Sequence, residues 1–214
     1  MKNAIGMILA VVMAIACMCF VQAAAAEQME AEVLGGWERP ESPEITEEIQ
    51  TLCGNAFEGM TGVSYTPVAL LGTQVVAGTN YRILFRSAPA APGAEETYAI
   101  GTLYEDLDGN VTLTDMQRSE IEPGINGLEG GWVQSDSPVI TKQVQHIFEC
   151  AMDGLVGVDY QPIALLSSQV VAGTNYAVVC EATVISPDAA SCYAIVYVNE
   201  ALDGTAALLD IVIL

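Results

Sequence analysis

The sequence has little positive charge and almost no histidine. Its 214 residues include six lysines and arginines and one histidine, against 27 aspartates and glutamates, so the formal net charge is −21. A chain this acidic repels the phosphates of nucleic acids and of anionic lipids. We therefore expect no nucleic-acid partner and no binding to a membrane surface. Solubility explains the charge best, and steering toward a basic partner is the alternative.

Motifs for catalysis and cofactor binding are also missing. The sequence contains no phosphate loop, no dinucleotide-binding glycine pattern and no complete calcium loop. Past the first 26 residues, the cysteines lack the close spacing of a zinc site, and His146 is the single histidine. We therefore predict a protein with no metal, no cofactor and no enzymatic activity.

What the sequence does contain is an internal repeat. The octet Gln74–Tyr81 returns unchanged as Gln169–Tyr176, an offset of 169 − 74 = 95 residues. The same offset relates two glycine-tryptophan segments and two turns, which are Gly35-Gly36-Trp37 with Gly130-Gly131-Trp132 and Asp108-Gly109 with Asp203-Gly204. A fixed period indicates two copies of one structural unit. We predict one domain at 27–119 and, after a linker, a second within 120–214.

The first 26 residues are predicted to be a secretory signal peptide. Lys2 precedes an uncharged run that is apolar through Val21 and ends in small residues before Glu27. A basic start, an apolar centre and a small-residue cleavage site are typical of such signals. A retained membrane anchor, or a lipid on Cys17 or Cys19, is the alternative. Cleavage would give a secreted or extracytoplasmic protein that is free of the membrane.

Each copy is predicted to be an α+β unit, with one helix packed across an antiparallel sheet of about four to five strands. In the first copy, Ser42 is the expected helix cap, and apolar residues from Ile45 to Phe57 recur on one helical face. The segments 65–71, 82–86, 97–104 and 111–117 are predicted to be strands, and a short strand can precede the helix. The Asp-Gly turn in 107–110 is a hairpin signal.

Four cysteines follow the N-terminal segment. Cys53 aligns with Phe148 on the apolar helix face, so a buried thiol is expected there, whereas Cys150 aligns with Asn55 off that face and should be exposed. Cys180 and Cys192 flank a loop of the second copy. Because a secreted protein folds in an oxidising compartment, we predict a disulfide bond between these two cysteines.

The octet has two possible interpretations. In one, Val75, Val76 and Ala77 form a buried strand and Gly78 marks a bulge. In the other, the same four residues form an exposed hairpin tip. The local sequence favours the tip, because 69–71 already supplies apolar core residues and Gly-Thr-Asn supplies turn chemistry. A small apolar tip on a rigid hairpin loses little conformational entropy on docking, which suits binding in a narrow cleft.

The octet resembles the central motif of the cystatins, which inhibit papain-like cysteine proteases, and it is most similar to that of the stefin branch. The resemblance covers both copies and includes the paired glycines, the Ser-Pro-Glu-Ile segment at 42–45 and the Leu-x-Gly turn at 107–109. It implies two tandem cystatin-like domains. It also implies reversible, steric inhibition with no covalent step. A non-inhibitory cystatin-like binding or adhesion module is the alternative.

By this resemblance, each copy would contact the protease through an arm and two hairpins. In the first copy these contacts would be made by Leu34, Gly35 and Gly36, by Gln74, Val75, Val76, Ala77 and Gly78, and by Leu107, Asp108 and Gly109. In the second copy they would be made by Gly130 and Gly131, by Gln169, Val170, Val171, Ala172 and Gly173, and by Leu202, Asp203 and Gly204. Because Glu129 stands where the first copy has Leu34, we expect the first copy to be the tighter inhibitor.

Overall fold

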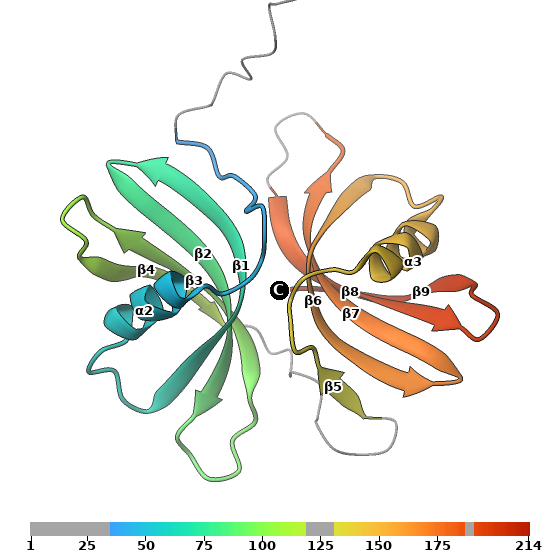
Figure 1. The fold of residues 1–214 in the computed structure, drawn as a ribbon, viewed down its shortest axis with the longest axis horizontal. Coiled ribbons are helices and arrows are strands. Elements are labelled where there is room, and N and C mark those ends of the chain that lie inside the picture. Colours follow the sequence, from blue (N-terminus) through green and yellow to red (C-terminus); the bar gives the residue numbers. More distant parts are fainter. Residues whose placement is uncertain (1–34, 119–130, 187–190) are drawn as a thin grey trace, which may run out of the picture. The chain divides into compact units, whose positions relative to one another are not determined.

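The computed structural model describes residues 35–118, 131–186 and 191–214. The predicted signal peptide, Leu34 and Gly130 lie outside these residues. The chain divides into two units, Met1–Gly36 and Trp37–Leu214, and the sheets and helices described below all belong to the second unit. Within the described residues there are two helices and two antiparallel sheets, which confirms the predicted α+β class (Figure 1). Neither helix combines the length and the apolar composition of a bilayer span.

The first repeat, residues 37–118, forms one helix and a four-stranded sheet. Its strands pair in chain order, β1 (Val63–Val76), β2 (Gly78–Pro89), β3 (Thr97–Glu105) and β4 (Val111–Arg118). Helix α2 (Glu47–Ala56) buries Ile49 and Cys53 in a cluster with apolar residues of the sheet, among them Phe85 and Leu103. The pattern of apolar residues on one helical face therefore predicted the buried side of α2. Burial raises the pKa of the Cys53 thiol to about 12.

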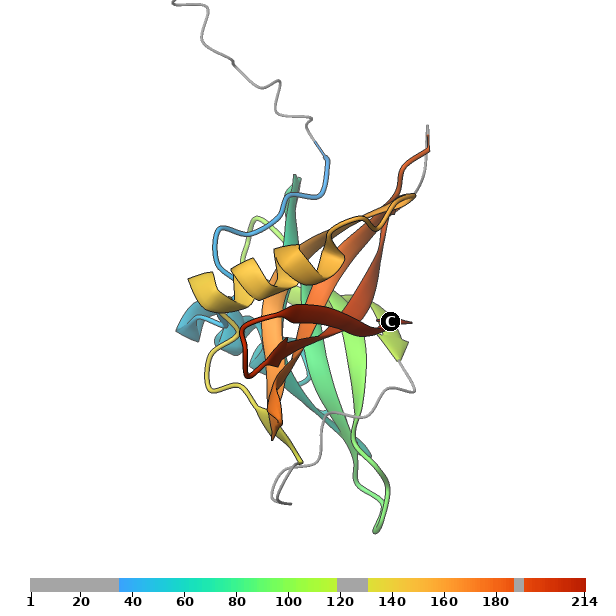
Figure 2. The same cartoon turned by 90° about the vertical axis from the view of Figure 1, so that its right-hand side faces the viewer.

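The second repeat, residues 131–214, has the same arrangement with one additional strand. Its sheet runs in the order β5 (Trp132–Gln134), β6 (Val158–Val171), β7 (Gly173–Val184), β8 (Ser191–Ala201) and β9 (Ala206–Ile213). Helix α3 (Lys142–Met152) lies across this sheet (Figure 2) and buries Val144, Ile147 and Phe148 against it. Strand β5 is the short strand expected before the helix. The first repeat has only an isolated bridge, Glu38 with Thr73, at the corresponding place.

Helix α2 begins after the predicted start. The hydroxyl of Thr46 accepts the N–H of Ile49 at 3.3 Å, so Thr46, and not Ser42, caps α2. Thr141 caps α3 in the same way. The segment before α2 remains extended because it is bonded to the sheet, with the N–H of Leu70 donating to the carbonyl of Pro43 at 2.9 Å. A capping threonine four residues downstream therefore overrides the Ser-Pro-Glu signal.

The helix-free faces of the two sheets share one apolar cluster. It includes Leu71, Leu84 and Ile100 of the first sheet and Leu166, Val179 and Ile195 of the second. Polar contacts join the repeats as well, since Arg39 forms an ion pair with Glu181 at 3.2 Å and Arg86 is hydrogen-bonded to Gln134. Each repeat thus has its own sheet and helix, but part of its core is completed by the other repeat.

The predicted Cys180–Cys192 disulfide is wrong, because the four cysteines in the described residues are free thiols. The strand register gives the reason: Cys180 lies opposite Ala194, whereas Cys192 lies opposite Ala182. Cys180 is buried in the cluster beneath α3, where burial raises its pKa, and Cys192 is exposed. Cys53 is buried and Cys150 is exposed, as predicted.

The shared cluster leads to a testable expectation for unfolding. Ile195 is fully buried in it, and Ile→Ala substitutions at such sites cost roughly 2–5 kcal/mol. We expect Ile195→Ala to lower the melting temperature of both repeats together. Tryptophan fluorescence measures the unfolding of each repeat separately in variants that retain only Trp37 or only Trp132. Two separate transitions, with the Trp37 signal unchanged by the substitution, would show that the first repeat is stable without the second.

Candidate functional site at the hairpin ends

The strand register brings two hairpins together at one end of each sheet. We call the β1–β2 turn (β6–β7 in the second repeat) the first hairpin, and the β3–β4 turn (β8–β9) the second hairpin. Thr79, just after the first tip, pairs with Glu105, from which the chain enters the second hairpin. In the second repeat Gly173 pairs with Ala201 in the same way. The two tips of each repeat are therefore neighbours (Figure 1), and we call them together the hairpin edge.

The tips of the first hairpins carry exposed valines. Val75 and Val76 are 57% and 43% exposed, and their counterparts Val170 and Val171 are 73% and 43% exposed. This confirms the exposed-tip interpretation of the octet and excludes the buried-strand alternative. The strands continue almost to the tip, since Val76 pairs with Gly78 and only Ala77 lies between them. At the second hairpins, Leu107 and Leu202 are each 85% exposed.

The polar residues of the octet hold the first hairpin together. The side-chain amide of Asn80 donates to Gln74 Oε1 at 2.7 Å, and the corresponding distance from Asn175 to Gln169 is 2.8 Å. The Tyr81 hydroxyl donates to Glu105 at 3.0 Å, which ties the hairpin to β3. Partial burial, together with this bond, raises the pKa of Tyr81. The fold thus accounts for the glutamine, the asparagine and the tyrosine of the octet, but not for its exposed valines.

Gly78 allows the two hairpins to approach each other closely. Its φ is +121°, and a Cβ added there would lie 2.3 Å from the backbone oxygen of Glu105. Gly173 has the same conformation, with a distance of 2.1 Å to the oxygen of Glu200. No side chain fits at that separation, so glycine is required by the fold at these positions. Gly78 was predicted to contact the protease, and the structure adds this separate reason for its presence.

Hydrogen bonds to an aspartate carboxylate form the turn of each second hairpin. In the first repeat the Asp106 carboxylate accepts the N–H groups of Asp108 at 2.9 Å and Asn110 at 2.8 Å, and the Asn110 side chain at 2.8 Å. The side-chain bond from Asn110, followed by the backbone bonds, lowers the pKa of Asp106. In the second repeat Asp203 accepts the hydroxyl and the N–H of Thr205, and its pKa is lowered for the same reason.

Gly131, from the predicted arm of the second repeat, lies toward the hairpin edge of that repeat. Strand β5 is antiparallel to β6 with Trp132 opposite Gln169, so Gly131, just before Trp132, lies on the side of the first tip. In the first repeat, Glu38 and Thr73 exchange backbone hydrogen bonds of 2.7 and 2.9 Å. Gly35 has a φ of +91°, which favours glycine. Gly35 and Gly36 belong to the other unit of the chain.

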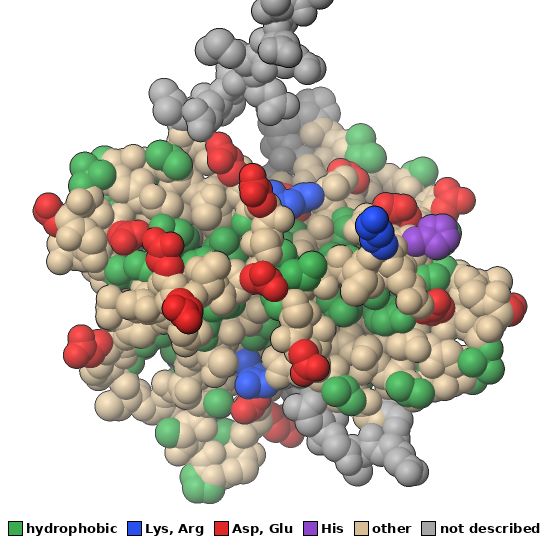
Figure 3. All heavy atoms as spheres, viewed as in Figure 1, with side chains coloured by type: hydrophobic (Ala, Val, Ile, Leu, Met, Phe, Trp, Pro, Cys, Tyr) green, Lys and Arg blue, Asp and Glu red, His purple; other side chains and the backbone are tan. Residues whose placement is uncertain are grey.

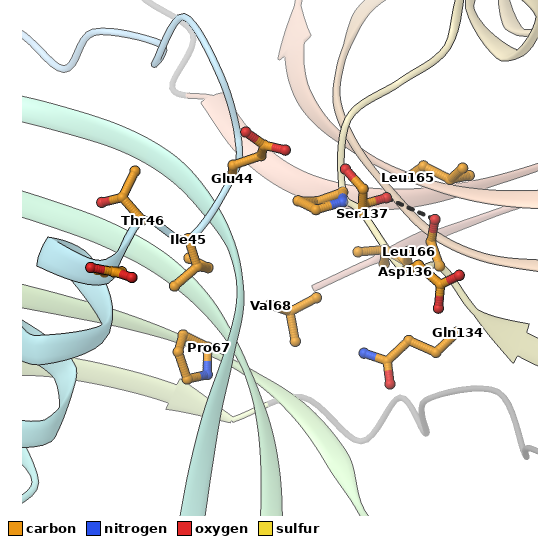
Figure 4. Close-up of a pocket in the computed structure, with 13 residues that line it drawn as sticks. Glu44, Ile45, Thr46, Pro67, Val68, Gln134, Asp136, Ser137, Leu165 and Leu166 are labelled. Carbon is orange, nitrogen blue, oxygen red and sulfur yellow. Dashed lines mark hydrogen bonds between the residues drawn. The ribbon is translucent and has the colours of Figure 1, made fainter.

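A cleft between the two repeats lies away from the hairpin edges. It has a volume of about 560 Å³ and is lined by residues of both repeats, including Ile45, Val68, Ser137 and Leu166 (Figure 4). Its serines are occupied in a turn, because the Ser135 hydroxyl donates to the carbonyl of Ser137 at 2.7 Å and the Ser137 hydroxyl accepts the N–H of Val139. No three His, Cys, Asp or Glu side chains gather as a metal site within the described residues.

On the face shown in Figure 3, charged side chains do not mark a single site. Acidic side chains are spread over the face shown in Figure 3 and are not gathered over one element. No protein-family model and no curated protein matches the chain. The hairpin edge stands out because the exposed Val75 and Val76 of the first repeat recur as the exposed Val170 and Val171 of the second.

Two residues that shape the hairpin edge were not predicted from the sequence to belong to the site. Tyr104 donates its hydroxyl to the carbonyl of Ala77 at 2.5 Å, and Asp106 organises the second turn of the first repeat. Both residues differ between the copies, where Asn199 and Ala201 replace them. A search for identities between the repeats therefore passes over them. Their positions in the sequence, next to the two predicted turns, could have indicated that they belong to the site.

The close approach at Gly78 generates a prediction with an internal control. We expect Gly78→Ala to destabilise the protein more than Gly109→Ala, because both glycines have positive φ but only Gly78 faces an atom within 4 Å. The shared backbone strain costs about 1–3 kcal/mol at either position. Urea unfolding of the two variants measures the difference. Equal losses of stability would mean that the hairpins do not meet as described.

The lowered pKa of Asp106 generates a prediction on pH. Because the folded state holds this carboxyl below its ordinary pKa, the turn is stabilised when the group is ionised and loses that stabilisation as the pH falls through the lowered pKa. We expect NMR titration of the Asp106 carboxyl to give a pKa below the ordinary aspartate value, with the Asn110 amide signal shifting in parallel. An ordinary pKa, or an independent Asn110 signal, would contradict the hydrogen bonds of this turn.

Proposed function

We propose that this chain is a tandem cystatin-like, reversible inhibitor of papain-like cysteine proteases, with one hairpin edge per repeat entering a protease cleft. The observation that carries the proposal is the solvent exposure of Val75, Val76, Val170 and Val171 at tips that the rest of the octet holds rigidly. The resemblance of the octet to the cystatin motif supplies the class of protease. The predicted signal peptide supports a secreted or extracytoplasmic site of action.

Exposed valines at a rigid tip can contribute to binding when a partner covers them. Burying a valine side chain contributes roughly 1.5–3 kcal/mol. The tip is already ordered by pairing on both sides, so little conformational entropy remains to be lost when it docks. Leu107 and Leu202 add a second apolar contact beside each first tip. Such an edge matches a narrow, partly apolar groove better than a flat surface.

The chemistry of the edge favours a steric mechanism. Valine, alanine, leucine and glycine form most of it, and Asp106, Asp108 and Asp203 are its charged members. Valine and alanine offer no nucleophile or proton donor from their side chains, so these residues act by filling space. The protease would therefore be blocked reversibly, without a bond to its catalytic cysteine.

Titration of papain with the purified full chain tests the proposal. We expect Val76→Asp and Val171→Asp each to weaken inhibition by its own repeat about tenfold or more, since one buried valine accounts for that factor. Both valines are 43% exposed and contribute little to the core, so the variants should fold. The double variant should lose inhibition by both hairpin edges.

The matched control is Val156→Asp. Val156 is 87% exposed and lies just before β6, at the end of that strand opposite the first hairpin. The control variant should inhibit as the unaltered protein does. Absence of inhibition by the unaltered protein at micromolar concentration, or full inhibition by the double variant, would rule the proposed function out.

A further inference from the structure

A row of polar side chains stands behind each first hairpin, and the two rows differ in one member. In the first repeat the ladder places Gln74 opposite Asn80 and Asn80 opposite Tyr104. In the second repeat it places Gln169 opposite Asn175 and Asn175 opposite Asn199. The first two members are identical in type and form the same hydrogen bond. The third position is Tyr104 in the first repeat and Asn199 in the second, so the two repeats compare these side chains on the same backbone arrangement.

Tyr104 reaches the tip of the first hairpin. Its hydroxyl donates to the carbonyl of Ala77, the single residue between the two strands, at 2.5 Å. Its ring also covers Gly78, since a Cβ added to that glycine would lie 2.9 Å from Tyr104 Cε2 and 3.1 Å from its hydroxyl oxygen. One side chain from β3 thus contacts both the turn residue and the glycine after it.

Asn199 is directed elsewhere in the second repeat. Its amide donates to Asn175 Oδ1 at 2.7 Å, so it extends the polar row and does not bond the tip. The atoms nearest to a Cβ added at Gly173 are all backbone atoms of Glu200 and Ala201. The tips also differ in exposure, since Val75 is less exposed than its counterpart Val170. In the first repeat, Tyr104 is therefore hydrogen-bonded to the hairpin tip. In the second repeat, the corresponding Asn199 is hydrogen-bonded to Asn175 instead.

We propose that Tyr104 is a positioning residue that fixes the first hairpin tip of the first repeat and makes this repeat the tighter protease inhibitor of the two. The inference rests on the proposed function. A hydrogen bond to the turn carbonyl narrows the conformations of the tip before binding, so fewer are lost in the complex. Its removal is expected to weaken binding about three- to tenfold, the usual net effect of one hydrogen bond.

The experiment uses Tyr104→Phe, which removes the hydroxyl and keeps the ring. It is made in the full chain that also carries Val171→Asp, so that inhibition of papain reports the first repeat. We expect the inhibition constant to rise about three- to tenfold, mainly through faster dissociation. Amide hydrogen exchange in the free protein should become faster at 75–79 and stay unchanged at 170–174, which serves as the internal reference.

The reciprocal variant is Asn199→Tyr in a chain that also carries Val76→Asp. It gives the second repeat the tyrosine of the first, and we expect tighter inhibition with slower exchange at 170–174. An effect in both directions cannot come from general destabilisation by the substitutions, because the reciprocal change adds a contact.

The outcomes separate this inference from the proposed function. Unchanged exchange at 75–79 in Tyr104→Phe would show that Tyr104 does not fix the tip, and faster exchange with an unchanged inhibition constant would show that fixing it does not matter for binding. Either result overturns the inference. Should the unaltered protein fail to inhibit papain, the proposed function falls, and the role assigned to Tyr104 in the tighter inhibition falls with it.

Discussion

The hairpin edge of each repeat depends on a backbone contact that glycine alone permits. At Gly78 and Gly173 the first hairpin passes so close to the neighbouring strand that an added Cβ would lie 2.3 and 2.1 Å from a carbonyl oxygen. This contact sets the first and second hairpins side by side, and the ladder between β2 and β3, or β7 and β8, continues it into the sheet. A helix packed across the sheet supports the strands from behind. The edge is therefore a consequence of the sheet, and its position does not rely on a flexible loop.

The octet divides into residues that build this edge and residues that the edge presents. Glycine allows the close approach, the glutamine–asparagine pair joins the two strands, and the tyrosine ties the hairpin to the glutamate of the next strand. The two valines do none of this and remain exposed in both repeats. Structural need accounts for the first group. We attribute the two valines to binding. The exact recurrence of all eight residues then reflects the requirements of both folding and binding on one short segment.

Much of the fold follows from local sequence, and the failures have physical causes. The apolar segments and the Asp-Gly turns between them predicted the strands, and the apolar helical face predicted the residues buried under α2 and α3. Pairing with β1 moved the start of α2 to Thr46, and strand register separated Cys180 from Cys192, and neither effect can be seen in a local pattern. The exposed valines were predicted, whereas Tyr104 was not, because its role requires knowing which strand lies beside the tip. The shared cluster of the two sheets also depends on tertiary packing.

The central claim is that the hairpin edges meet the protease and that the opposite ends of the sheets do not. Amide hydrogen exchange of the full chain with and without saturating papain tests it directly, because binding slows exchange where the protein is covered. The account predicts new protection at 75–78 and 107–109, at 170–173 and 202–204, and unchanged exchange at 154–157, the turn at the other end of β6. Protection concentrated at that turn or on the exposed faces of α2 and α3, with the hairpin tips unchanged, would contradict it.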